Sequence, residues 1–187
     1  MSRRVFAIAD TCFLIDWARF RRRDVLFKLF KAVFVPEDVL NEVRSEETIA
    51  WISSALSRDY LALYTPSRDE VNEARQLIEE SRLISHIPSI DLPEAICLVV
   101  GRRRGYVVLT ENKGALLIPR YVGRYSEVVV WRSLEVILNA ILEGVVEINC
   151  SKPDELFSEY SRDTLHIFPA KALNRAVEEV KRKCLRT

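Results

Sequence analysis

The sequence has few of the residue types that several common functional sites need. Its 187 residues include only 5 glycines, with no G-x-G-x-x-G motif and no Walker loop, which argues against a glycine-rich cradle for nucleotide phosphates. The 2 histidines, His86 and His166, lie outside every motif described below, so we expect no histidine-based catalysis. The 4 cysteines form no C-x-x-C pair, which argues against a zinc ribbon and a secreted disulfide framework. Free thiols are the default expectation, with an oxidised pair as the alternative in a hyperthermophile.

Long apolar runs are absent as well. No stretch approaches the roughly 18 to 20 apolar residues of a membrane-spanning helix, and the N-terminal segment reaches Asp10 too early to form the apolar centre of a signal peptide. We therefore expect a cytoplasmic protein with no membrane partner. An excess of one charge is also missing, because 28 basic and 27 acidic residues give a net charge of +1. Affinity for a nucleic acid must then come from local clusters.

Hydrophobic residues make up 49% of the chain and include five short runs that predict β-strands. These runs do not alternate with polar residues, which is typical of strands buried on both faces. Helical patterns separate them, so the sequence predicts an α/β fold with a mostly parallel central sheet and helices on both sides. The predicted strands cover residues 5–9, 32–35, 61–64, 106–110 and 127–131, and the predicted helices cover 13–20, 36–43, 48–57, 68–84, 93–104 and 133–144.

The alternation of strands and helices stops near residue 145. Beyond it the sequence shows only one short helical pattern and one terminal helical pattern. We predict a main domain over residues 1–144 and a helical C-terminal extension over residues 145–187.

Five carboxylates are predicted to lie at one edge of the sheet. Asp10 directly follows the first strand, and Glu111 directly follows the fourth. Glu42 lies in the helix after the second strand, beside its apolar stripe. Asp91 and Glu94 begin the helix that leads back to the fourth strand. Because the carboxyl ends of parallel strands share one edge, where open α/β sheets bind ligands, we expect all five side chains there.

Neither core packing nor helix formation requires such a cluster, and like charges brought together raise one another's pKa values. Mg²⁺ and Mn²⁺ favour oxygen ligands, and a few carboxylates hold them while they bind substrate phosphates. We predict a site for one of these cations, with Asp10, Asp91 and Glu94 as metal ligands. Glu42 and Glu111 complete the acidic catalytic pocket.

Each of these residues also has a purely structural interpretation. Asp10 can cap the helix that follows it, and Asp91 with Glu94 fits a capping box. The pair at 111–112 can belong to a turn. Only the joint occurrence of the five favours the functional interpretation.

Two further acidic residues, Glu46 and Asp16, lie near the predicted cluster in the sequence. Glu46 is a rival for the role of Glu42, which by itself can be a solvated helix residue. Asp16, six residues after Asp10, is expected to pair with Arg19 one helical turn further on.

Four short motifs resemble those of the PIN-domain nucleases, a family that includes the VapC-type toxin ribonucleases. They are DTCFLID at 10–16, VPEDVLNEV at 35–43, SIDLPEA at 89–95 and VLTEN at 108–112, within a match over residues 4–143. The last motif departs from the usual ending of the family, because Glu111 and Asn112 stand where aspartates are common. This leaves open whether Glu111 ligates a metal directly, through water or not at all.

The resemblance implies a three-layer α/β/α fold, a Mg²⁺ or Mn²⁺ site and metal-dependent hydrolysis of RNA by an endoribonuclease. It also suggests a homodimer. A toxin would have a small antitoxin protein as partner, whereas a processing nuclease would not. The family core does not account for the extension at 145–187.

Basic residues are expected on both edges of the sheet. Lys113, Arg120 and Arg124 fall in the loop after the fourth strand, at the acidic edge, where they can hold substrate phosphates. Thr11 and Asn112 are further expected substrate contacts. The arginine runs at 21–23 and 102–104 end helices at the opposite edge, where cations offset the helix dipole.

Two other functions stay open. A PIN-like domain that does not cut can serve as a scaffold or RNA-binding subunit, which the unusual ending at 111–112 favours. A strand-end aspartate also suits a phosphoacceptor domain, but no lysine closely follows the last predicted strand, where a receiver-type domain would need one.

Overall fold

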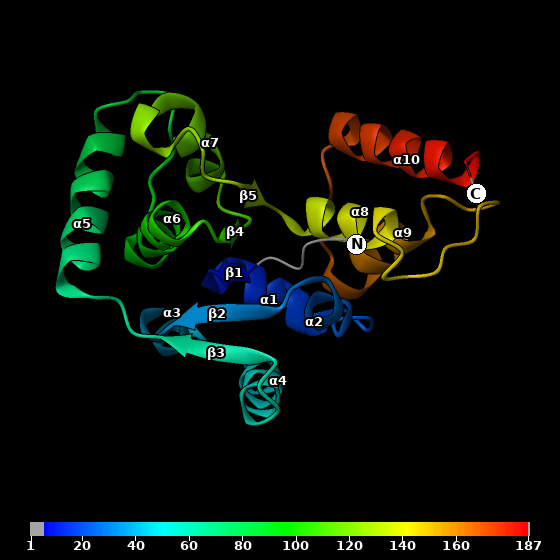
Figure 1. Ribbon diagram of the computed structural model, residues 1–187, viewed down its shortest axis with the longest axis horizontal. Coiled ribbons are helices and arrows are strands. Elements are labelled where there is room, and N and C mark those ends of the chain that lie inside the picture. The colour runs from blue at the N-terminus through cyan, green and yellow to red at the C-terminus, as the bar shows by residue number, and fades with distance from the viewer. Residues whose placement is uncertain (1–5, 187) are drawn as a thin grey trace.

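The protein is built around a five-stranded sheet in which every neighbouring pair of strands is parallel. The structure, a computed structural model, describes residues 6–186, and the strand order is β3-β2-β1-β4-β5 (Figure 1). The strands are β1 (Phe6–Ala9), β2 (Ala32–Pro36), β3 (Leu61–Tyr64), β4 (Val107–Leu109) and β5 (Val130–Trp131). The predicted α/β class and parallel sheet are confirmed. Val5, which the prediction placed in the first strand, lies outside the described residues.

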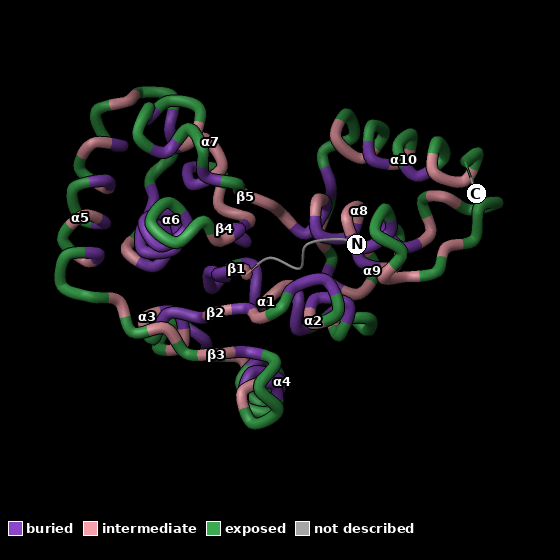
Figure 2. The backbone as a smooth tube through the Cα atoms, viewed as in Figure 1, coloured by how far each residue is buried: buried purple, intermediate pink, exposed green. Residues whose placement is uncertain are grey.

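Helices cover both faces of the sheet, and each face has its own apolar core (Figures 1 and 2). Ala7 and Ala9 of β1 face a core shared with α1, α2, α4, α8, α9 and α10, whereas Ile8 faces a core shared with α5, α6 and α7. The helices are α1 (Thr11–Arg19), α2 (Val25–Leu29), α3 (Glu37–Glu42), α4 (Glu46–Ser57), α5 (Arg68–Arg82), α6 (Leu92–Arg104), α7 (Lys113–Tyr121), α8 (Ser133–Leu142), α9 (Glu155–Thr164) and α10 (Ala170–Cys184), with a 3₁₀ turn η1 (Gly123–Tyr125) after α7. Burial on both faces explains why the strands lack polar alternation.

Two helices were not expected from the sequence. The segment of α2 is only five residues long, too short for a clear helical period. The segment of α7 carries Gly114 near its start and Pro119 near its end, and both residues disfavour a helix interior. The side chain of Asn112 begins α7 by accepting the N–H of Ala115 at 3.1 Å, which is a cap that the sequence pattern alone did not reveal.

The C-terminal extension forms the two expected helices, α9 and α10, and both pack on the main domain. Tyr160 of α9 is fully buried and lies against Trp17 and Phe20, with ring centroids 5.6 and 5.2 Å apart. Val180 of α10 is also fully buried in the same core. The extension therefore shares its core with α1 and α8 instead of forming a separate apolar centre.

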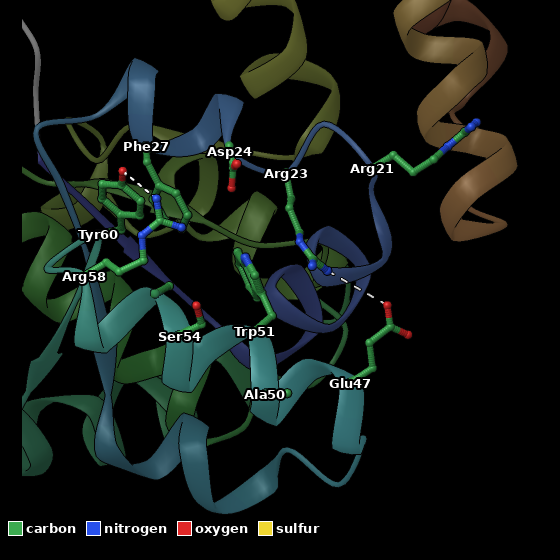
Figure 3. A pocket seen from close by; sticks show the side chains of 11 residues that line it. Arg21, Arg23, Asp24, Phe27, Glu47, Ala50, Trp51, Ser54, Arg58 and Tyr60 are labelled. Carbon is green, nitrogen blue, oxygen red and sulfur yellow. Dashed lines mark hydrogen bonds and ion pairs between the residues drawn. The ribbon is translucent and has the colours of Figure 1, made fainter.

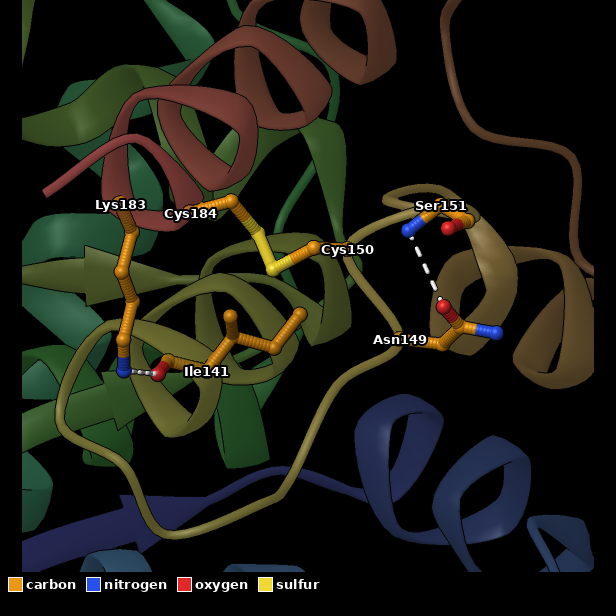
Figure 4. Close-up of a disulfide and its surroundings, with 6 residues drawn as sticks. All are labelled: Ile141, Asn149, Cys150, Ser151, Lys183 and Cys184. Carbon is orange, nitrogen blue, oxygen red and sulfur yellow. Dashed lines mark hydrogen bonds between the residues drawn. A yellow bond between two sulfur atoms is a disulfide. The ribbon is translucent and has the colours of Figure 1, made fainter. Parts of the chain in front are cut away.

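A disulfide joins Cys150 to Cys184, at the end of α10, across 34 residues of sequence (Figure 4). The default expectation of four free thiols is therefore wrong for this pair, whereas Cys12 and Cys97 are free. The packing of α10 along α8 brings the two cysteines together. The pairing therefore could not be predicted from the spacing of the cysteines in the sequence. The neighbouring Lys183 donates to the carbonyl oxygen of Ile141 in α8.

Candidate metal and active site

Asp10 stands where β1 ends and α1 begins. Its backbone N–H donates to the carbonyl of Leu109 at 3.0 Å, which extends the β1 to β4 ladder to this residue. Its side chain caps α1, because Oδ1 accepts the N–H of Phe13 at 2.8 Å while Oδ2 accepts the hydroxyl of Thr110. The residue is fully buried. The cap interpretation is confirmed, and it leaves further lone pairs on both oxygens, since a carboxylate oxygen accepts up to two bonds.

Glu94 reaches the same place from the first turn of α6. Its Oε2 accepts the backbone N–H of Asp91, the N-cap residue, at 3.1 Å, and its Oε1 accepts the side-chain amide of Asn112 at 3.3 Å. Glu94 is only 8% exposed, whereas Asp91 is exposed to solvent. The capping interaction between the two is thus present, and it fixes the Glu94 carboxylate.

The structure brings two of the three predicted metal ligands together. An oxygen of Asp10, an oxygen of Glu94 and the sulfur of Cys12 lie within 4.8 Å of one another. Asp91 is not part of this group, although its backbone holds Glu94. In the described part of the chain, no lysine or arginine nitrogen lies within 4.0 Å of the carboxylates of Asp10, Glu42, Asp91 or Glu94. Their charges are therefore not neutralised by an ion pair there.

Glu42, the last residue of α3, is tied to the start of α1. The hydroxyl of Thr11 donates to its Oε2 at 2.6 Å, so the first and second motifs meet. Glu42 itself is exposed. The rival Glu46 begins α4 instead. The Thr11 hydroxyl, predicted as a substrate contact, is engaged as this donor.

Glu111, which follows β4, is held through both of its oxygens. Oε1 accepts the backbone N–H of Ser133 at 2.7 Å and its hydroxyl at 2.6 Å, at the start of α8. Oε2 lies 3.6 Å from Nε2 of His166, whose Nδ1 lies 3.4 Å from Oδ2 of Asp16. The expected pair of Asp16 with Arg19 is therefore wrong, since among the described residues Asp16 has His166 as its ion-pair partner.

His166 is the residue at this site that sequence reasoning missed. It comes from the link between α9 and α10, and it is placed by ring contacts with Tyr160 and Phe168, whose centroids lie 6.0 and 5.1 Å away. The two contacts of His166 are ion pairs only when its imidazole carries a proton on both nitrogens. No sequence motif surrounds His166. The only available signal was that it is one of 2 histidines, in a segment rich in aromatic residues.

Burial and mutual repulsion raise the pKa values of the acidic residues. Burial, helped by the charges of Glu94 and Glu111, raises the pKa of Asp10 to about 7, although the hydrogen bonds from Thr110 and Phe13 act in the opposite direction. Burial also raises the pKa of Glu94, with contributions from Asp91 and Glu42. All five predicted carboxylates thus affect one electrostatic centre, and a cation among them would relieve this repulsion.

The donor set fits a hard divalent cation better than a soft one. Asp10 and Glu94 offer carboxylate oxygens, which Mg²⁺ and Mn²⁺ prefer. The third member, Cys12, binds metals as a thiolate, but burial and the neighbouring carboxylates raise its pKa to about 12. At neutral pH it is therefore a thiol, and water or the exposed Asp91 carboxylate is the more suitable further ligand.

The predicted phosphate contacts are spread along α7 and the turn after it. Lys113 begins α7, two residues after Glu111 in the sequence, and is exposed. Arg120 is exposed near the other end of α7 and lies over the ring of Tyr121. Arg124 is paired with Glu80 of α5 at 2.5 Å, so its guanidinium is already engaged. Of the three, Lys113 is the nearest along the chain to the acidic residues.

A pocket of about 510 Å³ lies beside Lys113. It is formed by α7, β5 and α8, with the charged side chains of Lys113, Arg132 and Glu135 around apolar residues such as Leu117. Arg132 is paired with Glu135 at 2.6 Å. Ser133, which binds Glu111, directly follows the lining residue Arg132 in the sequence.

The two arginine runs are occupied by structural ion pairs. Arg102 and Arg103, in the last turn of α6, both bind Glu73 at 2.7 to 2.8 Å. In the turn after α1, Arg21 binds Asp163 of α9 at 3.0 Å. The run at 102–104 ends α6 as predicted, whereas α1 already ends at Arg19, so the prediction that residues 21–23 end a helix is wrong.

Comparison with family models and with curated proteins gives no match for this chain. None of the helices in the described part of the chain combines the length and apolar character needed to cross a membrane. Function is therefore inferred from the chemistry of the site itself.

Proposed function

We propose that the protein is an endoribonuclease that uses Mg²⁺ or Mn²⁺ to hydrolyse RNA phosphodiester bonds. The observation that carries this proposal is the meeting of Asp10 and Glu94. Two carboxylates from segments 84 residues apart in the sequence converge, almost fully buried, and no lysine or arginine in the described part of the chain pairs with them. Burying charge without a partner is costly, so a cation is the expected partner.

The RNA substrate rests on the resemblance of the four motifs to PIN-domain nucleases. All four motifs contribute to the acidic edge, through Asp10, Glu42, Glu94 and Asn112, and they are linked by the hydrogen bonds described above. The α/β fold with helices on both faces is compatible with that family. A cytoplasmic location, and homodimerisation or binding of a small antitoxin, belong to the same proposal.

Each residue has a role in the proposed site. Asp10 and Glu94 would hold the cation, and Asp91, whose side chain lies outside their group, is the proposed third ligand. When bound, a divalent cation supplies positive charge opposite a phosphodiester and lowers the pKa of water. Glu42, which is exposed, accepts a proton from the attacking water, the bond from phosphorus to the leaving oxygen breaks, and the leaving oxygen takes a proton from solvent water. Lys113 binds a substrate phosphate at the rim.

The test is cleavage of an end-labelled single-stranded RNA by the purified chain. We expect cleavage with Mn²⁺, none with EDTA, and a loss of at least about 100-fold in rate for Asp10→Asn, which removes one ligand charge but keeps the shape of the cap. Asp69→Asn, an exposed residue in the first turn of α5, is the matched control and should keep the wild-type rate. Full turnover by Asp10→Asn would overturn the proposal.

A scaffold or RNA-binding role without cleavage is the second candidate, and one observation favours it. Oε1 of Glu111 accepts two hydrogen bonds from Ser133, Oε2 faces His166 at 3.6 Å, and Glu111 is not in the group of Asp10, Cys12 and Glu94. RNA binding that is indifferent to Mn²⁺, with no cleavage in the same assay, would support this role.

A further inference from the structure

The carboxylates of Asp10 and Glu94 are joined by a path of hydrogen bonds through Thr110 and Asn112, in the segment that follows β4. The hydroxyl of Thr110 donates to Oδ2 of Asp10 and accepts the backbone N–H of Asn112 at 3.0 Å. The side-chain amide of Asn112 donates to Oε1 of Glu94 at 3.3 Å. Two residues of one short segment therefore connect a carboxylate at the end of β1 to a carboxylate in the first turn of α6.

The direction of the Thr110 hydroxyl is fixed by its two neighbours. Thr110 is fully buried, and its hydroxyl carries a single hydrogen. Because the backbone N–H of Asn112 can only donate, the hydroxyl oxygen is the acceptor there and its hydrogen points to Asp10. The other oxygen of Asp10 accepts the N–H of Phe13 at 2.8 Å. One donor on each oxygen therefore sets the rotation of the Asp10 carboxylate.

The side-chain amide of Asn112 is oriented in the same way. It faces the backbone N–H of Ala115 at 3.1 Å, and because this N–H can only donate, the atom that faces it is the amide oxygen. The amide nitrogen is therefore the atom that faces Glu94. The second oxygen of Glu94 accepts the N–H of Asp91 at 3.1 Å, so this carboxylate also has a donor on each oxygen.

The residue type at position 112 matters for this arrangement. Aspartate would cap α7 as well as asparagine does, but its second oxygen would face the Glu94 carboxylate and repel it. Serine would also cap the helix, but its side chain lacks the amide nitrogen that reaches Glu94. Asparagine caps the helix and donates to Glu94 at the same time. This accounts for Asn112 at a position where aspartates are common in PIN-domain nucleases.

The donors to the two carboxylates are uncharged, unlike the cation in a pocket of about 410 Å³ between α2 and α4 (Figure 3). In that pocket the guanidinium of Arg23 faces the carboxylate of Glu47 at 3.9 Å and offsets its charge. The hydrogen bonds to Asp10 and Glu94 described above come from a hydroxyl, an amide and backbone N–H groups. Such donors fix the direction of a carboxylate and leave its negative charge available to a cation.

We infer that Thr110 and Asn112 are positioning residues that hold the carboxylates of Asp10 and Glu94 in the mutual orientation that binds a divalent cation. The inference rests on the cation site of the proposed function. In this role Asn112 acts through Glu94, whereas the sequence suggested a direct contact with the substrate. Hydrogen-bond partners of this kind orient metal ligands, and their loss typically weakens metal affinity by about 10- to 100-fold.

The test is a calorimetric titration of Mn²⁺ at pH 7.5 into variants that keep both carboxylates. Thr110→Val has nearly the shape of threonine but no hydroxyl, and we expect it to bind Mn²⁺ about tenfold more weakly than the wild type. Thr110→Ser keeps the hydroxyl and should bind as the wild type does. Asn112→Ser keeps a cap for α7 and removes the donor to Glu94, so its affinity should also fall about tenfold. A capping role alone would leave that affinity unchanged.

Ser67→Ala is the matched control for a general loss of stability. It removes the cap of α5, where Ser67 bonds to Glu70, and it changes none of the hydrogen bonds to Asp10 or Glu94. Its melting temperature should fall while its affinity for Mn²⁺ stays that of the wild type. Equal weakening of Mn²⁺ binding by Ser67→Ala would attribute the losses to stability and overturn the inference.

The outcomes separate the inference from the proposed function. If the wild type binds Mn²⁺ and either Thr110→Val or Asn112→Ser, folded by circular dichroism, binds it as tightly, the inference fails and the cation site stands. The inference also fails if Thr110→Ser binds as weakly as Thr110→Val. If the wild type does not bind Mn²⁺, the cation site of the proposed function fails together with the inference. Asn112→Ser decides the matter if Thr110→Val does not fold.

Discussion

At the scale of single residues, Asp10 combines a structural and a chemical role. It caps α1 through Phe13 and is bonded to Thr110, so its orientation is set by the end of β1 and by β4. The same position buries it completely. An aspartate at the protein surface could cap a helix with an ordinary pKa. The pKa of Asp10 is raised because the residue is buried.

This burial predicts a pH dependence for the metal-free protein. The pKa of Asp10 rises from 3.8 to about 7 on folding. Between these values the unfolded chain has released a proton that the folded chain keeps, so stability falls as the pH rises from 4 to 7. At about 1.4 kcal/mol per unit, the loss is at most about 4 kcal/mol. Asp10→Asn should lose this slope and melt at the same or a higher temperature than the wild type at pH 7.

Thermal unfolding in EDTA at pH 4, 5.5 and 7 measures this effect. Asp69→Asn, which changes an exposed carboxylate, should keep the slope of the wild type. An Asp10→Asn variant with an unchanged slope would show that Asp10 is ionised in the folded protein without penalty, against the burial that the structure shows.

His166 should contribute to stability because it bridges Asp16 and Glu111. Replacing it by Gln removes the ion-pair contacts to both carboxylates, and the Glu111 side chain is only 10% exposed. We expect His166→Gln to lower the free energy of unfolding by about 1 to 2 kcal/mol. The exposed His86 offers the control, and His86→Gln should stay within about 0.5 kcal/mol of the wild type. Urea unfolding at pH 6 distinguishes the two variants, and equal values would mean that the bridge is not formed.

At the scale of elements, the start of α7 must pack closely on the segment before α6. A Cβ at Gly114 would overlap the carbonyl oxygen of Pro88 and lie 2.7 Å from Cγ2 of Ile90. Gly114→Ala therefore forces α7 away from the segment that leads into Asp91. We expect a loss of about 1 to 3 kcal/mol in unfolding free energy, as for other overpacked sites.

Gly123→Ala is the matched control for this change. No atom lies within 4 Å of a Cβ added there, so its stability should be close to that of the wild type. Urea unfolding of both variants decides the point. If the two behave alike, the close contact between α7 and the segment before α6 does not exist in solution.

Most of the sheet was predictable from the sequence, because strands buried on both faces leave an uninterrupted apolar signal. All five strands were found within a few residues of their observed bounds. Helices α2 and α7 were not found, since the first is too short for a period and the second contains Gly114 and Pro119. Element order alone also predicted the meeting of Asp10 with Glu94.

The part of the site that was not predictable comes from packing over long distances. His166 packs on Tyr160, and Tyr160 buries its ring beside Trp17 and Phe20, which brings His166 to Glu111. Nothing in the local sequence specifies that contact. The position of the Asp91 side chain, outside the group of Asp10 and Glu94, was equally beyond the reach of a pattern.

At the scale of the whole molecule, the C-terminal extension is fastened to the main domain by its core and by the disulfide. The bond between Cys150 and Cys184 closes a loop of 34 residues in the unfolded chain. In the loop-entropy description such a bond adds roughly 3 to 4 kcal/mol of stability. We expect dithiothreitol to lower the urea midpoint of the wild type and to leave that of a Cys150→Ser, Cys184→Ser double variant unchanged.

Thiol counting gives an independent check of the same bond. The denatured, unreduced protein should show two reactive thiols, from Cys12 and Cys97, and the reduced protein should show four. Four thiols without reduction would exclude the bond.

The most direct test of the central claim, that buried carboxylates from distant segments hold a divalent cation, is a calorimetric titration of Mn²⁺ at pH 7.5. The wild type should bind Mn²⁺ with release of protons, because ligation needs Asp10 ionised and its pKa lies near 7. Affinity should fall as the pH is lowered to 6, and Asp10→Asn should bind at least about tenfold more weakly. Binding of equal strength by the wild type and Asp10→Asn, or no binding by either, would contradict the account.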